Sequence, residues 1–231
     1  METRSFDIPR YLSVLPLFND LRPDELESLA AGCQLLRLGR GDMVCRVGLP
    51  CEEFHVVVMG QVKLYAISPA GQEKVIELIG PGNSFGEALM FTGKPYIVSA
   101  QALTDSLVLR VSKDAVLTEI AGDSRFALRM LAGISRRLHG LVHDVQAHAL
   151  HSGMQRVIGY LLREREVEDC ASGEVLIVSL PVSKATIASR LSLTPEYFSR
   201  VLHELEAAGL IQIDKRDIRI LDAQRLARHP V

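Results

Sequence analysis

The stretch of residues 124–150 constrains the fold of this chain more than any other part of its sequence. It contains no proline, and its apolar residues recur at alternating intervals of three and four. That spacing is the a/d pattern of a helix that packs along its length against another helix. The residues at the repeated positions are Leu131, Ile134, Leu138, Leu141, Val145 and His148. The stretch therefore predicts one long helix with an interface along one side.

Two kinds of partner are compatible with that interface. A helix buried in the core of its own chain would show a similar stripe. The length of the stripe and the polar His148 within it favour a second copy of the chain, so we expect a homodimer joined by a coiled coil. The helix also separates two regions of different composition, and we therefore expect it to act as a hinge as well.

Residues 35–112 have the composition of a small β-sheet domain. The segments 54–58, 61–65, 74–78 and 107–111 are rich in β-branched and apolar residues, and glycines recur between them. Short strands with turn signals at this spacing predict an antiparallel barrel or roll. Short helices are expected within residues 9–32, and Ser112 is a suitable N-cap for the helix that follows the roll.

Residues 183–206 have the pattern of a helix-turn-helix. Small Ala188 allows two helices to cross closely, and Leu193 fills the turn between them. Thr194 and Pro195 supply the second helix with an N-cap and a first residue. After Gly209, two short β-rich segments flank a turn at residues 214–217, which predicts a β-hairpin wing. A helical hairpin that does not touch DNA is the alternative, but the order of these features favours a winged helix-turn-helix.

The second helix of such a motif presents its side chains to base edges in the major groove. The candidates for that role are Glu196, Tyr197, Ser199, Arg200 and His203. Contacts to phosphates, which position the protein without reading sequence, are expected from Lys184, Thr186, Arg190 and, again, His203. Residues 183–231 carry more basic than acidic side chains, whereas residues 1–122 carry more acidic ones. The charge is therefore distributed as double-stranded DNA would require.

Several other classes of protein are disfavoured by what the sequence lacks. It has no GxSxG, Walker or HExxH motif, so we do not expect an enzyme. The N-terminus has no apolar signal-peptide core and no apolar run is long enough to span a membrane, so we expect a cytoplasmic protein without a membrane partner. Cys33, Cys45, Cys51 and Cys170 form no CxxC pair, which argues against a zinc ribbon or a disulfide framework.

The predicted fold class is therefore α+β in three parts. Residues 1–122 form an effector-sensing antiparallel β-roll, residues 123–151 a long dimerisation helix, and residues 152–231 a winged helix-turn-helix that binds DNA.

This order of parts resembles the CRP/FNR superfamily of transcription regulators over nearly the whole chain. The motifs that carry the resemblance are Gly60-Gln-Val, Phe85-Gly-Glu-Ala-Leu-Met-Phe91 and Glu196-Tyr-Phe-Ser-Arg200. The resemblance implies a cyclic-nucleotide-binding-like jelly roll and a partnership with RNA polymerase. In the FNR-like branch, E-x-x-S-R on the recognition helix is associated with half-sites of the TTGAT type. Arg200 would pair with the two acceptors of a guanine, and Glu196 would accept a hydrogen bond from a cytosine amino group.

The effector is less clearly indicated than the DNA module. Gly86-Glu87 resembles the start of the phosphate-binding cassette of cyclic-nucleotide binders, but Ile97 or Val98 stands where that cassette carries arginine. A buried phosphate without a guanidinium is unfavourable, so cyclic AMP is not expected, although Lys94 could supply a cation. An iron-sulfur cluster is not expected either, because the cysteine-rich N-terminal segment of FNR is absent.

The run from Phe85 to Ala102, together with Phe198-Ser-Arg200, is similar to the Dnr-type branch, which is nitric-oxide-responsive and regulates denitrification. That resemblance implies haem in an apolar pocket between the roll and the long helix. The pocket would be formed by Leu64, Leu78, Phe85, Gly86, Glu87, Leu89, Val98, Ser99, Leu138, Leu141 and Val142. The candidate axial ligands are His55, His139, His143 and His148; Leu15 and Pro16 stand near the positions of the branch's N-terminal histidines. Another small molecule, a cyclic nucleotide or no effector at all are the alternatives.

Overall fold

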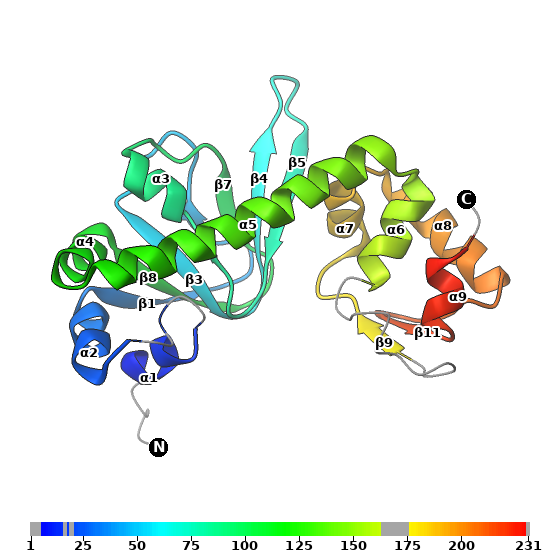
Figure 1. Cartoon of the computed structure of the whole chain (residues 1–231). Coiled ribbons are helices and arrows are strands. Elements are labelled where there is room, and N and C mark those ends of the chain that lie inside the picture. Colours follow the sequence, from blue (N-terminus) through cyan, green and yellow to red (C-terminus); the bar gives the residue numbers. More distant parts are fainter. Residues whose placement is uncertain (1–5, 16–17, 19–20, 163–175, 230–231) are drawn as a thin grey trace, which may run out of the picture. The chain divides into compact units, whose positions relative to one another are not determined.

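The computed structural model describes residues 6–15, 18, 21–162 and 176–229, except for the side chains of six residues in the long helix: Arg136, Arg137, His143, Asp144, Ala147 and His148. The chain divides into two compact units, Met1–Gly140 and Leu141–Val231 (Figure 1). Each unit is built around its own antiparallel sheet structure, and we describe them in turn.

The first unit contains two four-stranded antiparallel sheets that form the predicted roll. One sheet has the order β1-β8-β3-β6 and the other β2-β7-β4-β5. The strands are β1 (Cys33–Leu38), β2 (Met43–Cys45), β3 (Glu53–Met59), β4 (Val62–Ile67), β5 (Glu73–Ile79), β6 (Ser84–Phe85), β7 (Ser99–Ala102) and β8 (Ser106–Ser112).

The core of the roll is centred on β3 and β8, which pair from Glu53↔Ser112 to Met59↔Leu107. Phe54, Val56 and Leu109 are fully buried there. Burial of each such side chain contributes about 1.5–3 kcal/mol. The turn between β3 and β4 needs Gly60, because its φ is +89° and a Cβ would lie 2.8 Å from Cα of Ser106. The glycine of the Gly60-Gln-Val motif is thus explained by close backbone packing.

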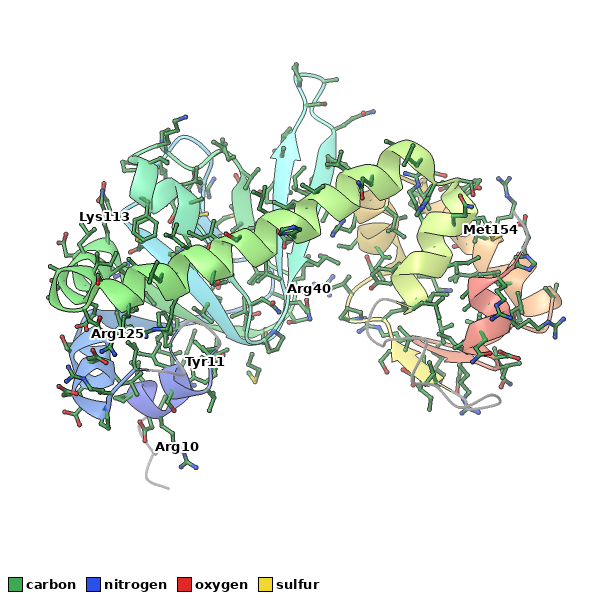
Figure 2. All side chains as sticks on the ribbon, in the orientation of Figure 1. Arg10, Tyr11, Arg40, Lys113, Arg125 and Met154 are labelled. Atoms are coloured by element: carbon green, nitrogen blue, oxygen red, sulfur yellow. The ribbon has the colours of Figure 1, made fainter. Side chains whose placement is uncertain are left out.

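Short helices cover one end of this roll. They are α1 (Ile8–Ser13), α2 (Pro23–Ala31) and α4 (Lys113–Gly122), while α3 (Glu87–Thr92) follows β6. Tyr11 of α1 donates a hydrogen bond to the carbonyl of Val57 in β3, and Arg10 beside it points away (Figure 2). The predicted cap of α4 is confirmed, since Oγ of Ser112 accepts from the amide of Ala115 at 3.3 Å.

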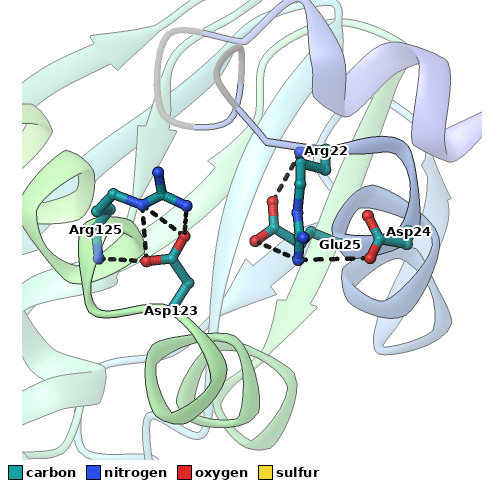
Figure 3. Close-up of polar contacts among 5 residues, drawn as sticks. All are labelled: Arg22, Asp24, Glu25, Asp123 and Arg125. Carbon is teal, nitrogen blue, oxygen red and sulfur yellow. Dashed lines mark hydrogen bonds and ion pairs between the residues drawn. The ribbon is translucent and has the colours of Figure 1, made fainter.

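The long helix α5 (Ser124–Leu150) begins directly after Asp123, which pairs with Arg125 in the first turn of the helix. Asp123 accepts hydrogen bonds from the amide of Arg125 at 2.9 Å and from its guanidinium at 2.6 Å (Figure 3). These bonds lower the pKa of the Asp123 carboxyl to about 2. At α2, the amide of Arg22 donates a hydrogen bond to Oε2 of Glu25 at 2.7 Å (Figure 3). Phe126 in the first turn of α5 then stacks on Phe18 at 5.9 Å and joins the core of the roll.

The second unit combines three helices of the DNA module, a small sheet and a short last helix. Its elements are α6 (Gly153–Leu162), β9 (Leu176–Ser179), α7 (Lys184–Arg190), α8 (Pro195–Ala207), β10 (Ile211–Asp214), β11 (Asp217–Ile220) and α9 (Ala223–Ala227). The sheet is antiparallel with the order β10-β11-β9, so the predicted wing hairpin pairs with the strand before the helix-turn-helix. Met154 marks the first turn of α6 (Figure 2).

The predicted α+β fold class is confirmed, including the long helix over residues 124–150 and the four strands proposed within the roll. The end of α6, which we expected near Glu168, and Cys170 lie outside the described residues. The sequence did not predict β1, β2, β7, α3 or α9 as separate elements. Periodicity is not established over the few residues of β2, β7, α3 and α9, and β1, although as long as β4, lacks the strict alternation of a half-buried strand.

Candidate nucleic-acid interface and sensor

The helix-turn-helix is set by two hydroxyl caps and a tight turn. Oγ of Ser183 accepts from the amide of Thr186, and Oγ1 of Thr194 accepts from the amide of Tyr197, each at 3.2 Å. Between the helices, Ser192 has a φ of 56° and the amide of Leu193 donates to the carbonyl of Ala188 at 2.9 Å. The two helices bury a shared apolar core formed by Ile187, Ala188, Phe198, Val201, Leu202 and Leu205. This burial fixes which face of α8 remains outside.

The outward face of α8 carries a row of polar side chains at helical spacing. The row consists of Glu196, Ser199, Arg200 and His203. The side chains of Arg200 and His203 are 65% and 70% exposed, and they lie 3.7 Å from Glu204 and 3.5 Å from Glu206, respectively. Such exposed ion pairs are weak, so they leave the two side chains free to reorient toward a ligand. The predicted base-reading residues other than Tyr197 therefore share one accessible face.

Tyr197 differs from its neighbours because it is half-buried. Its ring lies beneath the guanidinium of Arg200, with Cζ of that arginine 4.8 Å from the ring centroid. The same ring packs against Gly153 at the start of α6. Its surroundings are thus those of a packed side chain and not those of a free one.

The residues of α7 that we predicted to contact phosphates differ in their exposure to solvent. Lys184 and Thr186 lie in the first turn of α7 and are half-buried, and the Thr186 hydroxyl is hydrogen-bonded to that of Ser183 at 2.8 Å. Arg190 is only 9% exposed. Among these three residues of α7, Arg190 is the least available to a phosphate.

The wing adds basic side chains that we did not single out from the sequence. Lys215 and Arg216 are exposed at the turn between β10 and β11, where Lys215 has a φ of 54°. The wing is tied to α8, because the amide of Ile213 donates to Oε1 of Glu206 at 2.8 Å. The sequence signal that could have identified this basic surface is the pair of adjacent basic residues in the predicted hairpin turn.

In the roll, most of the predicted effector-pocket residues face the interior. Leu64, Phe85, Glu87 and Ser99 are buried, and Leu78, Leu89 and Val98 are partly buried. Gly86 has a φ of +98° and lies close to the backbone of β3. The helix residues are placed differently: Leu138 is 60% exposed, and Leu141 and Val142 belong to the second unit and are also exposed. Leu64, Phe85, Leu89 and Val98 therefore share the core of the roll, whereas Leu138 of the same unit is turned to solvent.

The segment 96–99, which corresponds in sequence to part of the phosphate-binding cassette, forms hydrogen bonds with other parts of the roll. Oγ of Ser99 accepts from the amide of Val47 at 3.1 Å, and the hydroxyl of Tyr96 donates to the carbonyl of Glu53 at 3.2 Å. Ile97 points outward with 67% of its surface exposed. No arginine is available in this segment to bind a cyclic phosphate, as the sequence already indicated.

His55 lies at the centre of the roll. It is fully buried on β3, stacks on Phe85 with 5.0 Å between ring centroids, and has Tyr96 on another side at 6.5 Å. Within the described part of the chain, neither ring nitrogen has a hydrogen-bond partner. Burial, and secondarily the charge of Arg110, lower the pKa of His55 to about 4, so the ring is neutral at physiological pH.

Two family models match the chain. A cyclic nucleotide-binding domain matches residues 35–123, and a Crp-like helix-turn-helix domain matches residues 155–229. The structure of DNR from Pseudomonas aeruginosa is 38% identical, with a TM-score of 0.51, and the match covers 94% of this chain and 95% of that one. This chain belongs to the CRP/FNR family of transcription regulators.

Other family members match at lower identity over similar lengths. The CRP-like cAMP-activated global transcriptional regulator of Mycobacterium tuberculosis is 24% identical over 92% of this chain and 95% of its own length. The structure of FixK2 from Bradyrhizobium japonicum has a TM-score of 0.75 at 24% identity, covering 86% of this chain and 98% of that one, and shows the shared fold. These relatives are transcription regulators and not enzymes, as we expected for this chain.

Within the described residues, three thiols of this CRP/FNR regulator lie in the roll. Cys45 and Cys51 are buried and Cys33 is partly buried, and all three are free. Desolvation raises the pKa of Cys33 and of Cys45 to about 12, so their reactive thiolate forms are disfavoured. No set of three His, Cys, Asp or Glu side chains suited to a metal ion occurs within residues 6–15, 18, 21–162 and 176–229.

The apolar stripe of α5 is largely uncovered in the single chain. Leu131, Leu138 and Val145 are each about 60–70% exposed, Leu141 is also exposed, and Ile134 is partly buried. The side chains of His143 and His148 lie outside the described residues, whereas His139 is exposed, with Nδ1 3.3 Å from the carbonyl of Ser135. Among the helices of the described chain, none combines the length and the apolar character needed to cross a membrane.

Proposed function

We propose that this regulator is a sequence-specific homodimer that reads an FNR-like inverted repeat of TTGAT-type half-sites, with α8 in the major groove. The observation that carries the proposal is the outward row of α8, in which Glu196, Arg200 and His203 are exposed and Ser199 is partly exposed. Arg200 would donate to O6 and N7 of guanine and Glu196 would accept from N4 of cytosine, each contact contributing about 1–3 kcal/mol of discrimination. Lys184, Thr186, Arg190 and His203 would contact phosphates.

The apolar stripe of α5 supports the homodimer. Large apolar side chains that are exposed in a row on one helix are typical of an interface. Two copies of α5 packed along Leu131, Leu138 and Val145 would bury these side chains and hold two α8 helices together. The half-sites of the repeat should then have their centres about one DNA turn, ~34 Å, apart. RNA polymerase is the second macromolecular partner that we propose, on the ground of family membership.

We further propose that an effector in the roll switches the affinity for DNA, and that this effector is not cyclic AMP. The absence of an arginine in the cassette and the engagement of Ser99 by Val47 support that exclusion. The switch would be a shift between two conformations, for which a coupling free energy of ~1–3 kcal/mol is sufficient. A cyclic-nucleotide-responsive or other small-molecule-responsive regulator with the same DNA module is the alternative.

Haem, with nitric oxide as its ligand, is the specific effector that we put forward, since the chain is similar to DNR and its roll is lined by Leu64, Leu78 and Leu89. The described residues do not form a ready haem site, however. His55 is covered by Phe85 and Tyr96, and Leu138 is turned to solvent. Haem binding would therefore require a rearrangement of the roll. Parallel titrations with hemin and with cyclic AMP test the point: a Soret band that shifts with nitric oxide supports haem, and its absence excludes it.

The DNA-reading proposal is tested by selection from a random duplex library with the full chain. We expect enriched duplexes to carry two inverted TTGAT-type half-sites. Enrichment of a single half-site, of a different sequence or of none would contradict the proposal.

A further inference from the structure

Tyr197 occupies a position in the recognition helix that suggests a role other than contact with DNA. It lies in the first turn of α8, three residues before Arg200, and the guanidinium of that arginine lies over its ring at 4.8 Å. An aromatic face beneath a guanidinium attracts it without using its N–H groups, because these point outward in the plane of the group. Arg200 can therefore rest on Tyr197 and keep its donors free for a base.

The ring of Tyr197 is itself held from the other side. A Cβ placed on Gly153 would lie 2.5 Å from Cε1 and 2.9 Å from Cζ and from Oη of Tyr197. The ring and its hydroxyl thus rest directly on the backbone at the start of α6, and any side chain at residue 153 would displace them. The hydroxyl therefore lies on the side of α6, next to Gly153.

The start of α6 provides a firm support for this ring. Ser152 and Gln155 cap it reciprocally, since the amide of Gln155 donates to Oγ of Ser152 at 3.2 Å and the amide of Ser152 donates to Oε1 of Gln155 at 2.8 Å. Arg156 donates to the carbonyl of Leu191, in the turn between α7 and α8, at 2.7 Å. The first turn of α6 is therefore fastened to the helix-turn-helix independently of Tyr197.

We propose that Tyr197 is a positioning residue, which is clamped between Gly153 and Arg200 and holds the guanidinium for recognition of guanine. The proposal rests on the base-reading role given to Arg200 above. It assigns Tyr197 to selectivity through Arg200, in place of the direct base contact that the sequence predicts. It also explains why residue 153 is glycine, since a Cβ at this position would overlap the ring of Tyr197.

The test measures the binding of the full chain to two duplexes by fluorescence anisotropy. The duplexes carry the same inverted repeat, with either G·C or A·T at the base pair assigned to Arg200. The unmodified chain should prefer G·C by roughly 5- to 150-fold. Tyr197→Leu should lower this ratio by about fivefold or more, while affinity for a random duplex and the circular dichroism spectrum stay the same.

Two further variants separate positioning from a structural or hydroxyl role. Tyr197→Phe keeps the ring, so it should restore the G·C preference to within about twofold of the unmodified chain. Gly153→Ala should displace the ring and lower the preference, but it should add nothing to Tyr197→Leu, because both changes remove the same support. Tyr65→Leu is a matched control: it removes a similar cation–aromatic pair in the roll, where Nζ of Lys63 lies 4.4 Å from the Tyr65 ring centroid. That control should leave the preference unchanged.

Three results would overturn the proposal. The first is that Tyr197→Leu weakens binding to both duplexes equally. The second is that Tyr197→Phe reduces the G·C preference as much as Tyr197→Leu does. The third is that Gly153→Ala leaves the G·C preference intact. If instead the unmodified chain shows no preference for G·C, then the base-reading role of Arg200 itself is wrong, and the role of Tyr197 falls with it. Should Tyr197→Leu fail to fold, the Gly153→Ala and Tyr197→Phe variants decide the question.

Discussion

The outward face of α8 and the interior of the roll use polar groups in opposite ways. On α8, Arg200 and His203 are exposed and weakly paired, so their chemistry is available to an incoming partner. In the roll, His55 and the thiol of Cys45 are buried, and desolvation holds both in their neutral forms. The DNA module therefore presents side chains that are ready for contact, whereas His55 and Cys45 in the roll could bind a ligand only after a rearrangement that uncovers them.

The largest expected effect is a difference in stability between substitutions on the buried face and on the outward face of α8. Phe198→Ala removes a fully buried ring and should lower the free energy of unfolding of the second unit by about 3–5 kcal/mol. Ser199→Ala, on the neighbouring outward position, should change it by less than about 0.5 kcal/mol. Urea unfolding of the two variants measures the difference, and similar losses in both would mean that the faces are wrongly assigned.

The roll should respond to acid through His55. Its pKa is about 4 in the folded chain against an ordinary value of 6.5, because burial and Arg110 disfavour the charged ring. The unfolded chain therefore takes up this proton first as the pH falls. Stability that is complete above pH ~6.5 should be lost between pH ~6.5 and ~4, by up to ~3 kcal/mol. Urea unfolding across this range checks the effect.

His55→Phe is the matched control for that measurement. The substitution keeps a ring against Phe85 and removes the titrating group, so the loss of stability in this pH window should become smaller. An identical pH profile in both proteins would assign the effect to other groups, among them Glu53, whose Oε1 lies 3.6 Å from Nε2 of His55.

Arg200→Ala tests whether the outward face of α8 reads a base. It should remove about 1–3 kcal/mol of discrimination at the guanine position with little change in the free energy of unfolding. Anisotropy with the G·C and A·T duplexes measures the discrimination. Lys184→Ala serves as the control, since loss of a phosphate contact should weaken all duplexes alike and reduce the salt dependence of binding.

The smallest effects concern the two hydroxyl caps, one in each unit. Ser112→Ala and Thr194→Ala should each cost about 1 kcal/mol of stability, because each leaves a helix amide without its acceptor. Only Thr194→Ala should also weaken DNA binding, since it loosens the first turn of α8. Thermal unfolding measures the stability of each variant, and anisotropy measures its affinity for DNA. Equal losses of DNA affinity in the two variants would contradict the assignment of DNA binding to the second unit alone.

The sequence predicted the DNA module better than the sensor for a physical reason. Thr194 and Pro195 mark the start of α8 through local helix geometry, and the four-residue spacing of Glu196 and Arg200 places these two side chains on one face. The residues around His55 come from β3, β6 and the segment near Tyr96, which meet only through long-range pairing. Neither the burial of His55 nor the support of Tyr197 by Gly153 could be predicted from spacing, because both depend on contacts between distant segments.

The most direct test of the account compares an inverted repeat with a random duplex while the oligomeric state is measured. In moderate salt, the full chain should sediment as a dimer and bind two inverted TTGAT-type half-sites about a thousandfold or more tighter than random duplex. Leu138→Glu, which places a charge in the exposed stripe of α5, should yield monomers that lose this advantage. A chain that sediments as a monomer and binds both duplexes equally would contradict the central claim.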